Sequence, residues 1–171
     1  MLRKTSFLLF IASIVYSSGK SQIINLEEKK TVTQNGIEYG YTIKNEQLKS
    51  AKGEEYSRFE ITLYATNNSG CTKLYAERTS FLSDESPNLI ATFHCSNANG
   101  KRLTAKSGTV KARDFYINVK VMENGKEVTQ SVKAGYIFRN GETLKDNIIV
   151  LVPKGERPTI DCTLNSLQEL R

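Results

Sequence analysis

Histidine and cysteine are scarce in this chain of 171 residues. It has one histidine, His94, and three cysteines, Cys71, Cys95 and Cys162, without any C-x-x-C or H-x-x-x-H spacing. A zinc site needs three or four clustered ligands, so the sequence predicts none. A cysteine nucleophile needs a nearby base, but His94 and Cys95 are neighbours on a predicted strand and would project to opposite faces. We therefore expect no metal and no cofactor.

Signatures of other catalytic sites are also missing. There is no D-x-D-x-D calcium loop and no G-x-S-x-G motif, and the four aspartates are isolated from one another. The sequence SGKS at 18–21 lacks the glycine that a phosphate-binding loop requires four residues earlier. We expect a protein that is not an enzyme. A pair of carboxylates that are distant in sequence, as in a glycosidase, stays open as an alternative.

Long apolar runs are confined to the start of the chain. The apolar core Phe7–Tyr16 follows a basic start and precedes small residues, which is the layout of a secretory signal peptide. We predict a signal peptide over residues 1–21, with cleavage after Gly19 as the alternative. After Tyr16 the longest apolar run is Ile148–Val152, which is far too short to cross a bilayer.

The predicted export has consequences for anchoring and charge. The first cysteine is Cys71, so we expect no lipoprotein anchor, and a secreted or periplasmic location. Without Arg3, Lys4 and Lys20, the 24 basic residues become 21 against 18 acidic ones, a net charge of +3. This modest charge does not argue for nucleic acid as a partner.

Alternation of apolar and polar residues dominates residues 22–171. It is clearest in RFEITLYAT (58–66), IEYGYTI (37–43), LIATFHC (89–95) and FYINVKVM (115–122), each of which reads as a half-buried strand. Asn-Gly pairs in QNGI (34–37) and ENGK (123–126) predict tight hairpins. Residues 45–56 have few apolar side chains and contain Gly53, which favours a loop. The sequence therefore predicts one all-β domain over residues 22–171, a two-sheet antiparallel β-sandwich.

The pattern of these strands, with the closing stretch AGYIFRNGETLKDNIIVLVPKGERPTI (134–160), resembles the immunoglobulin-like β-domains of secreted bacterial proteins. The resemblance is one of pattern, and it implies an immunoglobulin-like sandwich. The chain has no tryptophan, so it departs from antibody-type domains, in which a buried Trp packs on a disulfide.

The three cysteines allow two pairings in an oxidising compartment. If the strands run up, down and up again, Cys71 and Cys95 lie at the same end, and this is the pairing that we prefer. The alternation along their strands instead places the side chains of Cys95 and Cys162 on inward faces, where these two could pair. A third alternative is that no bond forms, and at least one thiol stays free or pairs between chains.

One stretch is strongly basic. Between residues 100 and 113 the sequence has five positive charges and no acidic residue: Lys101, Arg102, Lys106, Lys111 and Arg113. These residues are candidates for contact with an anionic partner such as an envelope glycan. The alternative is a solvated sheet edge, where lysines discourage pairing with other sheets. The stretch contains no aromatic residue for stacking on bases, which argues against nucleic acid.

Together these patterns predict an exported, non-catalytic binding module. Its partner would be an envelope or extracellular protein or glycan, recognised by loops and edge strands. Two other functions stay open: a structural subunit that joins an assembly by strand addition, and a hydrolase with scattered carboxylates.

Overall fold

The structure, a computed structural model, describes residues 22–51, 53–77, 86–103, 107–165, 167, 169 and 170. Within these residues every regular element is a β-strand, and every strand pair is antiparallel. None of the described residues forms a helix that could span a membrane. The predicted signal peptide, residues 1–21, lies outside the described residues.

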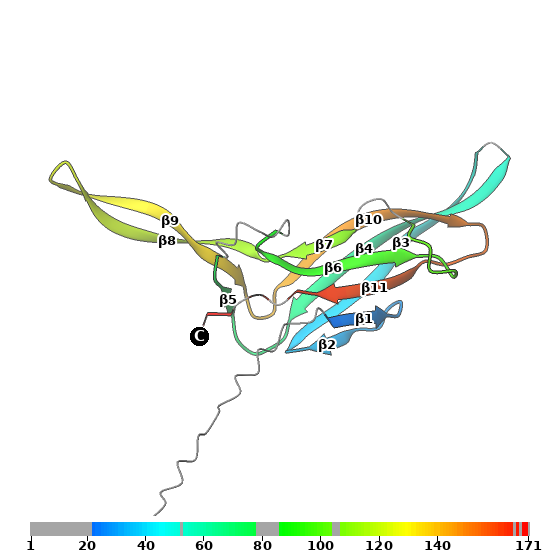
Figure 1. The fold of residues 1–171 in the computed structure, drawn as a ribbon, viewed down its shortest axis with the longest axis horizontal. Coiled ribbons are helices and arrows are strands. Elements are labelled where there is room, and N and C mark those ends of the chain that lie inside the picture. Colours follow the sequence, from blue (N-terminus) through cyan, green and yellow to red (C-terminus); the bar gives the residue numbers. More distant parts are fainter. Residues whose placement is uncertain are drawn as a thin grey trace, which may run out of the picture.

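The strands form three sheets (Figure 1). The first sheet has the order β1 (Gln22–Leu26), β11 (Thr159–Leu164), β6 (Leu89–Ser96) and β7 (Gly108–Lys111). The second has the order β10 (Thr143–Pro153), β4 (Glu54–Asn67), β3 (Ile37–Ala51) and β2 (Val32–Gln34). The third has the order β5 (Lys73–Tyr75), β9 (Lys126–Phe138) and β8 (Arg113–Glu123).

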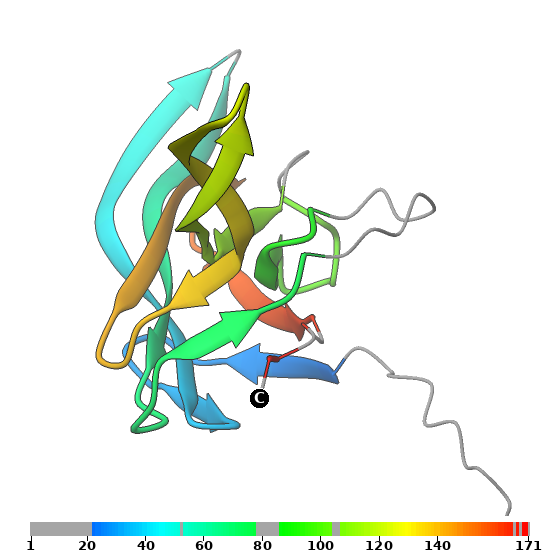
Figure 2. The same cartoon turned by 90° about the vertical axis from the view of Figure 1, so that its left-hand side faces the viewer.

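The first two sheets enclose the core. Figure 2 looks along the molecule and shows β3, β4 and β10 on one side and β6, β7 and β11 on the other. Side chains from both inner faces are fully buried, among them Phe59 and Leu63 of β4, Phe93 of β6 and Ile160 of β11. Burial of each such side chain stabilises the fold by about 1.5–3 kcal/mol. The all-β prediction is confirmed, and the facing antiparallel sheets are consistent with the predicted sandwich.

The two Asn-Gly hairpins are confirmed. Asn35 and Gly36 link β2 to β3 with φ angles of 53° and 75°. Asn124 and Gly125 link β8 to β9 with φ angles of 50° and 76°. Two successive residues with positive φ define the type I′ turn, whose twist matches that of the strands it joins, and Asn-Gly is the pair that adopts it most readily.

Two ribbons extend beyond the core, one at each end of the molecule (Figure 1). The predicted loop over residues 45–56 is wrong, because β3 and β4 stay paired out to Ala51 and Glu54. The strand predicted over residues 115–122 is present as part of β8. It is not half-buried as predicted, because no sheet of the described residues covers it, and its Ile117 is 42% exposed. Backbone pairing in both ribbons continues past the region in which the two sheets face each other.

Candidate interaction surface

The β10 strand forms one margin of the second sheet, with β4 as its neighbour. In an antiparallel pair, alternate residues direct both N–H and C=O to the same neighbour. The N–H of Asn147 is donated to the Asp146 carboxylate at 2.8 Å, and Pro153 has no N–H to donate to β4. Asn147, Ile149 and Leu151 therefore direct their backbone groups away from β4. Among the described residues, the backbone groups of Ile149 and Leu151 that point away from β4 have no partner, and we call them the open edge of β10.

The side chains along this edge are apolar and accessible. Ile149 is 54% exposed and Leu151 is 49% exposed, within the uncharged run Ile148–Val152. Natural edge strands are usually short, or carry lysines, prolines or bulges that prevent pairing. The other margins of the two facing sheets have five, three and four residues (β1, β2 and β7), whereas β10 has eleven and a regular register with β4. The β10 margin is thus the longest of the four. Lys145 near its start and Pro153 at its end are the protective residues, and the uncharged run Ile148–Val152 lies between them.

A solvent-open hollow of about 690 Å³ lies beside the open edge. Its apolar lining comes from Tyr56 and Leu103 together with Ile148, Ile149 and Leu151 of β10. Lys49 and Arg58 contribute basic side chains, and Arg58 is paired with Glu60. The hollow therefore combines backbone groups that no described residue pairs with, an aliphatic wall and a basic rim.

The single carboxylate of the hollow belongs to Asp146, and its oxygens are already engaged. One accepts the N–H of Thr109 at 2.9 Å and the other accepts the N–H of Asn147 at 2.8 Å. These bonds tie β7 to β10 and fix one end of the hollow. Because a glycosidase needs two carboxylates across the scissile bond, the lining of this hollow does not assemble such a pair.

The basic residues of the 100–113 stretch do not form one patch. Lys101 and Arg102 lie beside the last residue of β6, where Arg102 bridges to Ser96 and donates to the Ser107 hydroxyl. Both side chains are exposed. Lys106 lies outside the described residues.

The other two basic residues lie at the opposite end of β6. Lys111 is opposite Leu89 in the register and donates to the Ser86 hydroxyl at 2.9 Å. Arg113 is paired with Glu142 at 2.6 Å. Eight residues of extended strand span about 25 Å, so these side chains are too distant to act together with Lys101 and Arg102. Their role as an anionic contact stays a prediction.

Neither predicted disulfide is formed: all three cysteines have free thiols. Cys71 lies near the start of β6, since Ile90 lines the same small hollow as Lys73. Cys95 is five residues farther along β6, about 17 Å from Ile90. The prediction of Cys71–Cys95 assumed that the chain after Cys71 returns along the whole sandwich. Instead it forms the short β5, which pairs with β9 in the third sheet.

Cys95 and Cys162 do both face the core, with exposures of 1% and 0%. However, Cys162 is opposite Phe93 in the register and Cys95 is opposite Ile160, so the two cysteines are diagonal neighbours. Diagonal Cα atoms are about 7–8 Å apart, beyond the usual 4.4–6.8 Å of a disulfide. Burial raises the pKa of Cys95 to about 11 and that of Cys162 to about 12, so both thiols stay protonated and unreactive at neutral pH.

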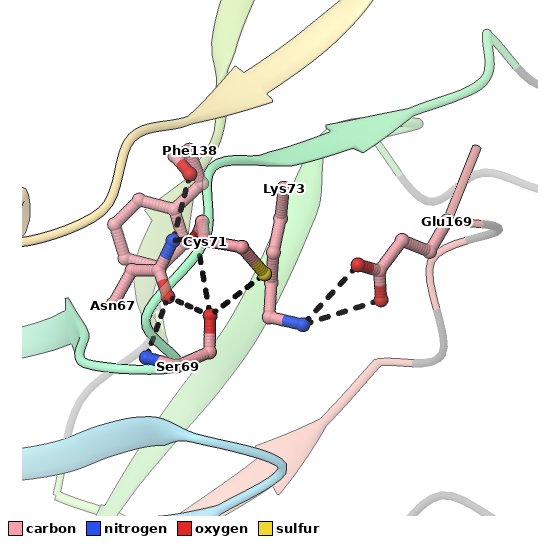
Figure 3. A network of polar contacts seen from close by, with 6 residues as sticks. All are labelled: Asn67, Ser69, Cys71, Lys73, Phe138 and Glu169. Atoms are coloured by element: carbon pink, nitrogen blue, oxygen red, sulfur yellow. Dashed lines mark hydrogen bonds and ion pairs between the residues drawn. The ribbon is translucent and has the colours of Figure 1, made fainter. Parts of the chain in front are cut away.

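A buried asparagine organises the turn that carries Cys71 (Figure 3). Asn67 is fully buried, and its Nδ2 donates to the carbonyls of Cys71 at 2.9 Å and Phe138 at 2.8 Å. Its Oδ1 accepts the N–H of Ser69 at 3.1 Å and the Ser69 hydroxyl at 2.7 Å. Because every polar atom of Asn67 is bonded within the fold, this network is structural, and it braces the turn without a disulfide.

A second polar pair in Figure 3 joins β5 to a residue near the C-terminus. Lys73 is buried, and its Nζ lies 3.2 Å from the Glu169 carboxylate. The N–H of Leu170 also donates to the Leu74 carbonyl at 2.8 Å. These contacts fasten the C-terminal residues to β5.

The described residues contain no group of three or more His, Cys, Asp or Glu side chains that could hold a metal ion. His94 Nδ1 lies 3.1 Å from the Ser107 hydroxyl. The Cys95 side chain is in the core, on the opposite face of β6. The two side chains are thus not arranged as a nucleophile and its base.

Comparison of the chain with protein-family models, curated proteins and solved structures gave no match.

Reasoning from the sequence missed the open edge of β10. In the sequence, the uncharged run Ile148–Val152 indicates only that no segment after Tyr16 is long enough to cross a membrane. The signal that could have found the edge is Pro153 directly after this run, because proline in a strand is confined to edges, ends and bulges. The strand order that makes β10 marginal is not visible in the sequence.

Proposed function

We propose that this is an exported, non-catalytic interaction protein that binds an extended segment of a partner polypeptide along the open edge of β10. We also assign its sandwich to the immunoglobulin-like class, on the pattern of strands and hairpin turns, and its location to the envelope or the extracellular space, on the predicted signal peptide. One observation carries the binding function: in an eleven-residue marginal strand, Ile149 and Leu151 direct backbone groups that no described residue pairs with toward a hollow with an aliphatic wall.

Strand addition uses features that the open edge has. Backbone N–H and C=O groups of a guest strand would pair with those of Ile149 and Leu151, and each such hydrogen bond contributes about 0.5–1.5 kcal/mol net. The guest's side chains would cover the exposed halves of the Ile149 and Leu151 side chains, which adds about 1 kcal/mol for each. Alternate guest residues would enter the hollow, where the aliphatic wall favours apolar side chains.

A polypeptide fits this surface better than a glycan does. The hollow contains Tyr56 and polar side chains, which suit either partner, but the backbone groups of the open edge pair in register only with the backbone of an extended polypeptide. Permanent strand addition into a larger assembly would use the same edge, and a tight complex that resists dilution is its distinguishing property.

The experiment begins with a random dodecapeptide library panned against residues 22–171, followed by fluorescence anisotropy with the enriched peptides. The expected peptides alternate apolar and polar residues. Two variants separate backbone from side chain: Ile149→Ala shortens the side chain but keeps the N–H, and Ile149→Pro removes the N–H on the side away from β4. We expect Ile149→Pro to weaken binding at least tenfold and Ile149→Ala by less than about fivefold.

Two results would overturn the proposal: enrichment of no alternating peptide, or equal binding by the two variants. Thermal melting shows whether Ile149→Pro keeps the fold. If it does not, N-methylation of alternate amides in the peptide removes the same backbone bonds from the other partner. A peptide whose binding is unaffected by methylation in both alternate sets would equally refute strand pairing.

A further inference from the structure

Residues 116–133 of β8 and β9 form a two-stranded ribbon, which we call the arm. Its strands pair only with each other, from Tyr116–Lys133 to Glu123–Lys126, while β5 pairs with β9 only at residues 136–138. The buried core has no member between Ala112 and Tyr136. Figure 1 shows the arm extending away from the sandwich, at the end opposite the tip of β3 and β4.

The two faces of the arm differ in chemistry. In the register, Ile117 is opposite Val132 and Val121 is opposite Val128, so these side chains share one face with Val119 and the uncharged Gln130. Ile117 and Val132 are 42% and 43% exposed. The opposite face is largely polar and includes an ion pair of 2.6 Å between Lys120 and Glu127, with Tyr116 and Met122 as its two exposed apolar members. We call the first of these the apolar face of the arm.

The base of the arm is held in a fixed geometry. A bulge between Phe115 and Tyr116 bends the ribbon, and Gly135 opposite it has a φ of 142°. A Cβ at Gly135 would lie 2.3 Å from the Tyr75 carbonyl oxygen, so only glycine fits there. Next to it, Lys133 Nζ lies 2.9 Å from Asp114 and 4.4 Å from the centre of the Tyr136 ring. The direction in which the arm leaves the sandwich is thus fixed at its base, which lowers the entropy lost on binding.

We propose that the apolar face of the arm packs against the same face of a second copy of this chain. A two-stranded ribbon is marginally stable alone in water, and an apolar face needs a cover. A second copy offers a cover of the same length and width with no charge, so packing face to face buries no unpaired ion. Across a two-fold axis the polar faces would remain in water and the arms would lie antiparallel.

The size of the face is sufficient for a weak dimer. Eight residues along the arm span about 26 Å, and two strands are about 10 Å wide. Val119, Val121 and Val128 are already partly buried, so two copies would bury at most on the order of 1,000 Å², the size of a weak, reversible contact. The contact does not involve β10, so this inference is independent of the proposed function.

Sedimentation velocity on residues 22–171, up to about 200 µM, tests the proposal. We expect a reversible dimer with a Kd of roughly 10 µM. Val119→Lys places a charge in the apolar face and should weaken the dimer at least tenfold. The matched control Asn118→Lys adds the same charge on the polar face and should change the Kd by less than about threefold.

A cysteine variant gives a readout that does not depend on Val119→Lys folding. Gln130 lies at the middle of the apolar face, so Gln130→Cys, in a background with Cys71→Ser, should form a disulfide-linked dimer under mild oxidation. Ser131→Cys on the opposite face should not. A wild-type chain that stays monomeric at about 200 µM would overturn the proposal. So would equal effects of the two lysine variants, equal cross-linking of the two cysteine variants, or a monomer that binds phosphatidylcholine–phosphatidylglycerol vesicles through Val119.

Discussion

Replacement of Asn67 by alanine tests the claim that this side chain, and not a disulfide, braces the turn at Cys71. The variant loses donors to the carbonyls of Cys71 and Phe138 and an acceptor for Ser69. Phe138 is fully buried, so its carbonyl would be left without that donor, which costs about 1–3 kcal/mol. Cys71 and its carbonyl lie in an exposed turn where water can replace the lost bond. Loss of the Ser69 bonds adds about 1 kcal/mol.

The expected loss for Asn67→Ala is therefore about 2–4 kcal/mol in the free energy of unfolding. Urea denaturation followed by far-ultraviolet circular dichroism measures it, and the midpoint should fall by at least about 1 M. The neighbouring Asn68 is exposed, so Asn68→Ala is the matched control and should stay within about 0.5 kcal/mol of the wild type. Equal stabilities for the two variants would refute the structural role assigned to Asn67.

Three further outcomes follow from the structure. In the folded protein without reductant, iodoacetamide should alkylate Cys71 alone, and Cys95 and Cys162 should react only after unfolding; intact mass counts the adducts, and a chain that accepts none contradicts the free thiols. Gly135→Ala should lower the free energy of unfolding by more than about 2 kcal/mol, because its Cβ would collide with the Tyr75 carbonyl; an unchanged urea midpoint would show that the bulge relaxes at little cost. Stability should fall as the pH rises above about 9, because the thiols of Cys95 and Cys162 ionise near pH 9 in the unfolded chain but stay protonated up to about 11 and 12 in the folded one. Urea midpoints that do not fall between pH 9 and 10.5 would contradict this.

The inner face of the sandwich could be predicted from the sequence because alternation reports side-chain direction along a strand. Phe59, Ile61 and Leu63 are buried as the pattern requires. The same alternation at Ile117 and Val119 indicates a strand, but it does not say whether a second sheet packs on the apolar face. Among the described residues no second sheet packs there. Periodicity shows which side chains share a face, whereas burial depends on how distant segments pack.

Hydrogen-bonded register was also beyond the sequence. Residues 45–56 have few apolar side chains, yet their backbones pair because the ladder needs no buried face once β3 and β4 are aligned. The cysteine pairing required the register of β6 with β11 and the path of β5, and both are long-range properties. The open edge of β10 needed the strand order, for which Pro153 was only a local hint.

Residue-resolved amide exchange by NMR tests the open edge of β10 most directly. In the free protein, the amides of Ile149 and Leu151 should exchange rapidly, while those of Ile148 and Val150, which bond to β4, should exchange slowly. Addition of an enriched alternating peptide should slow the Ile149 and Leu151 amides at least tenfold. Slow exchange at Ile149 and Leu151 in the free protein, or no slowing when the peptide is bound, would contradict strand addition at β10.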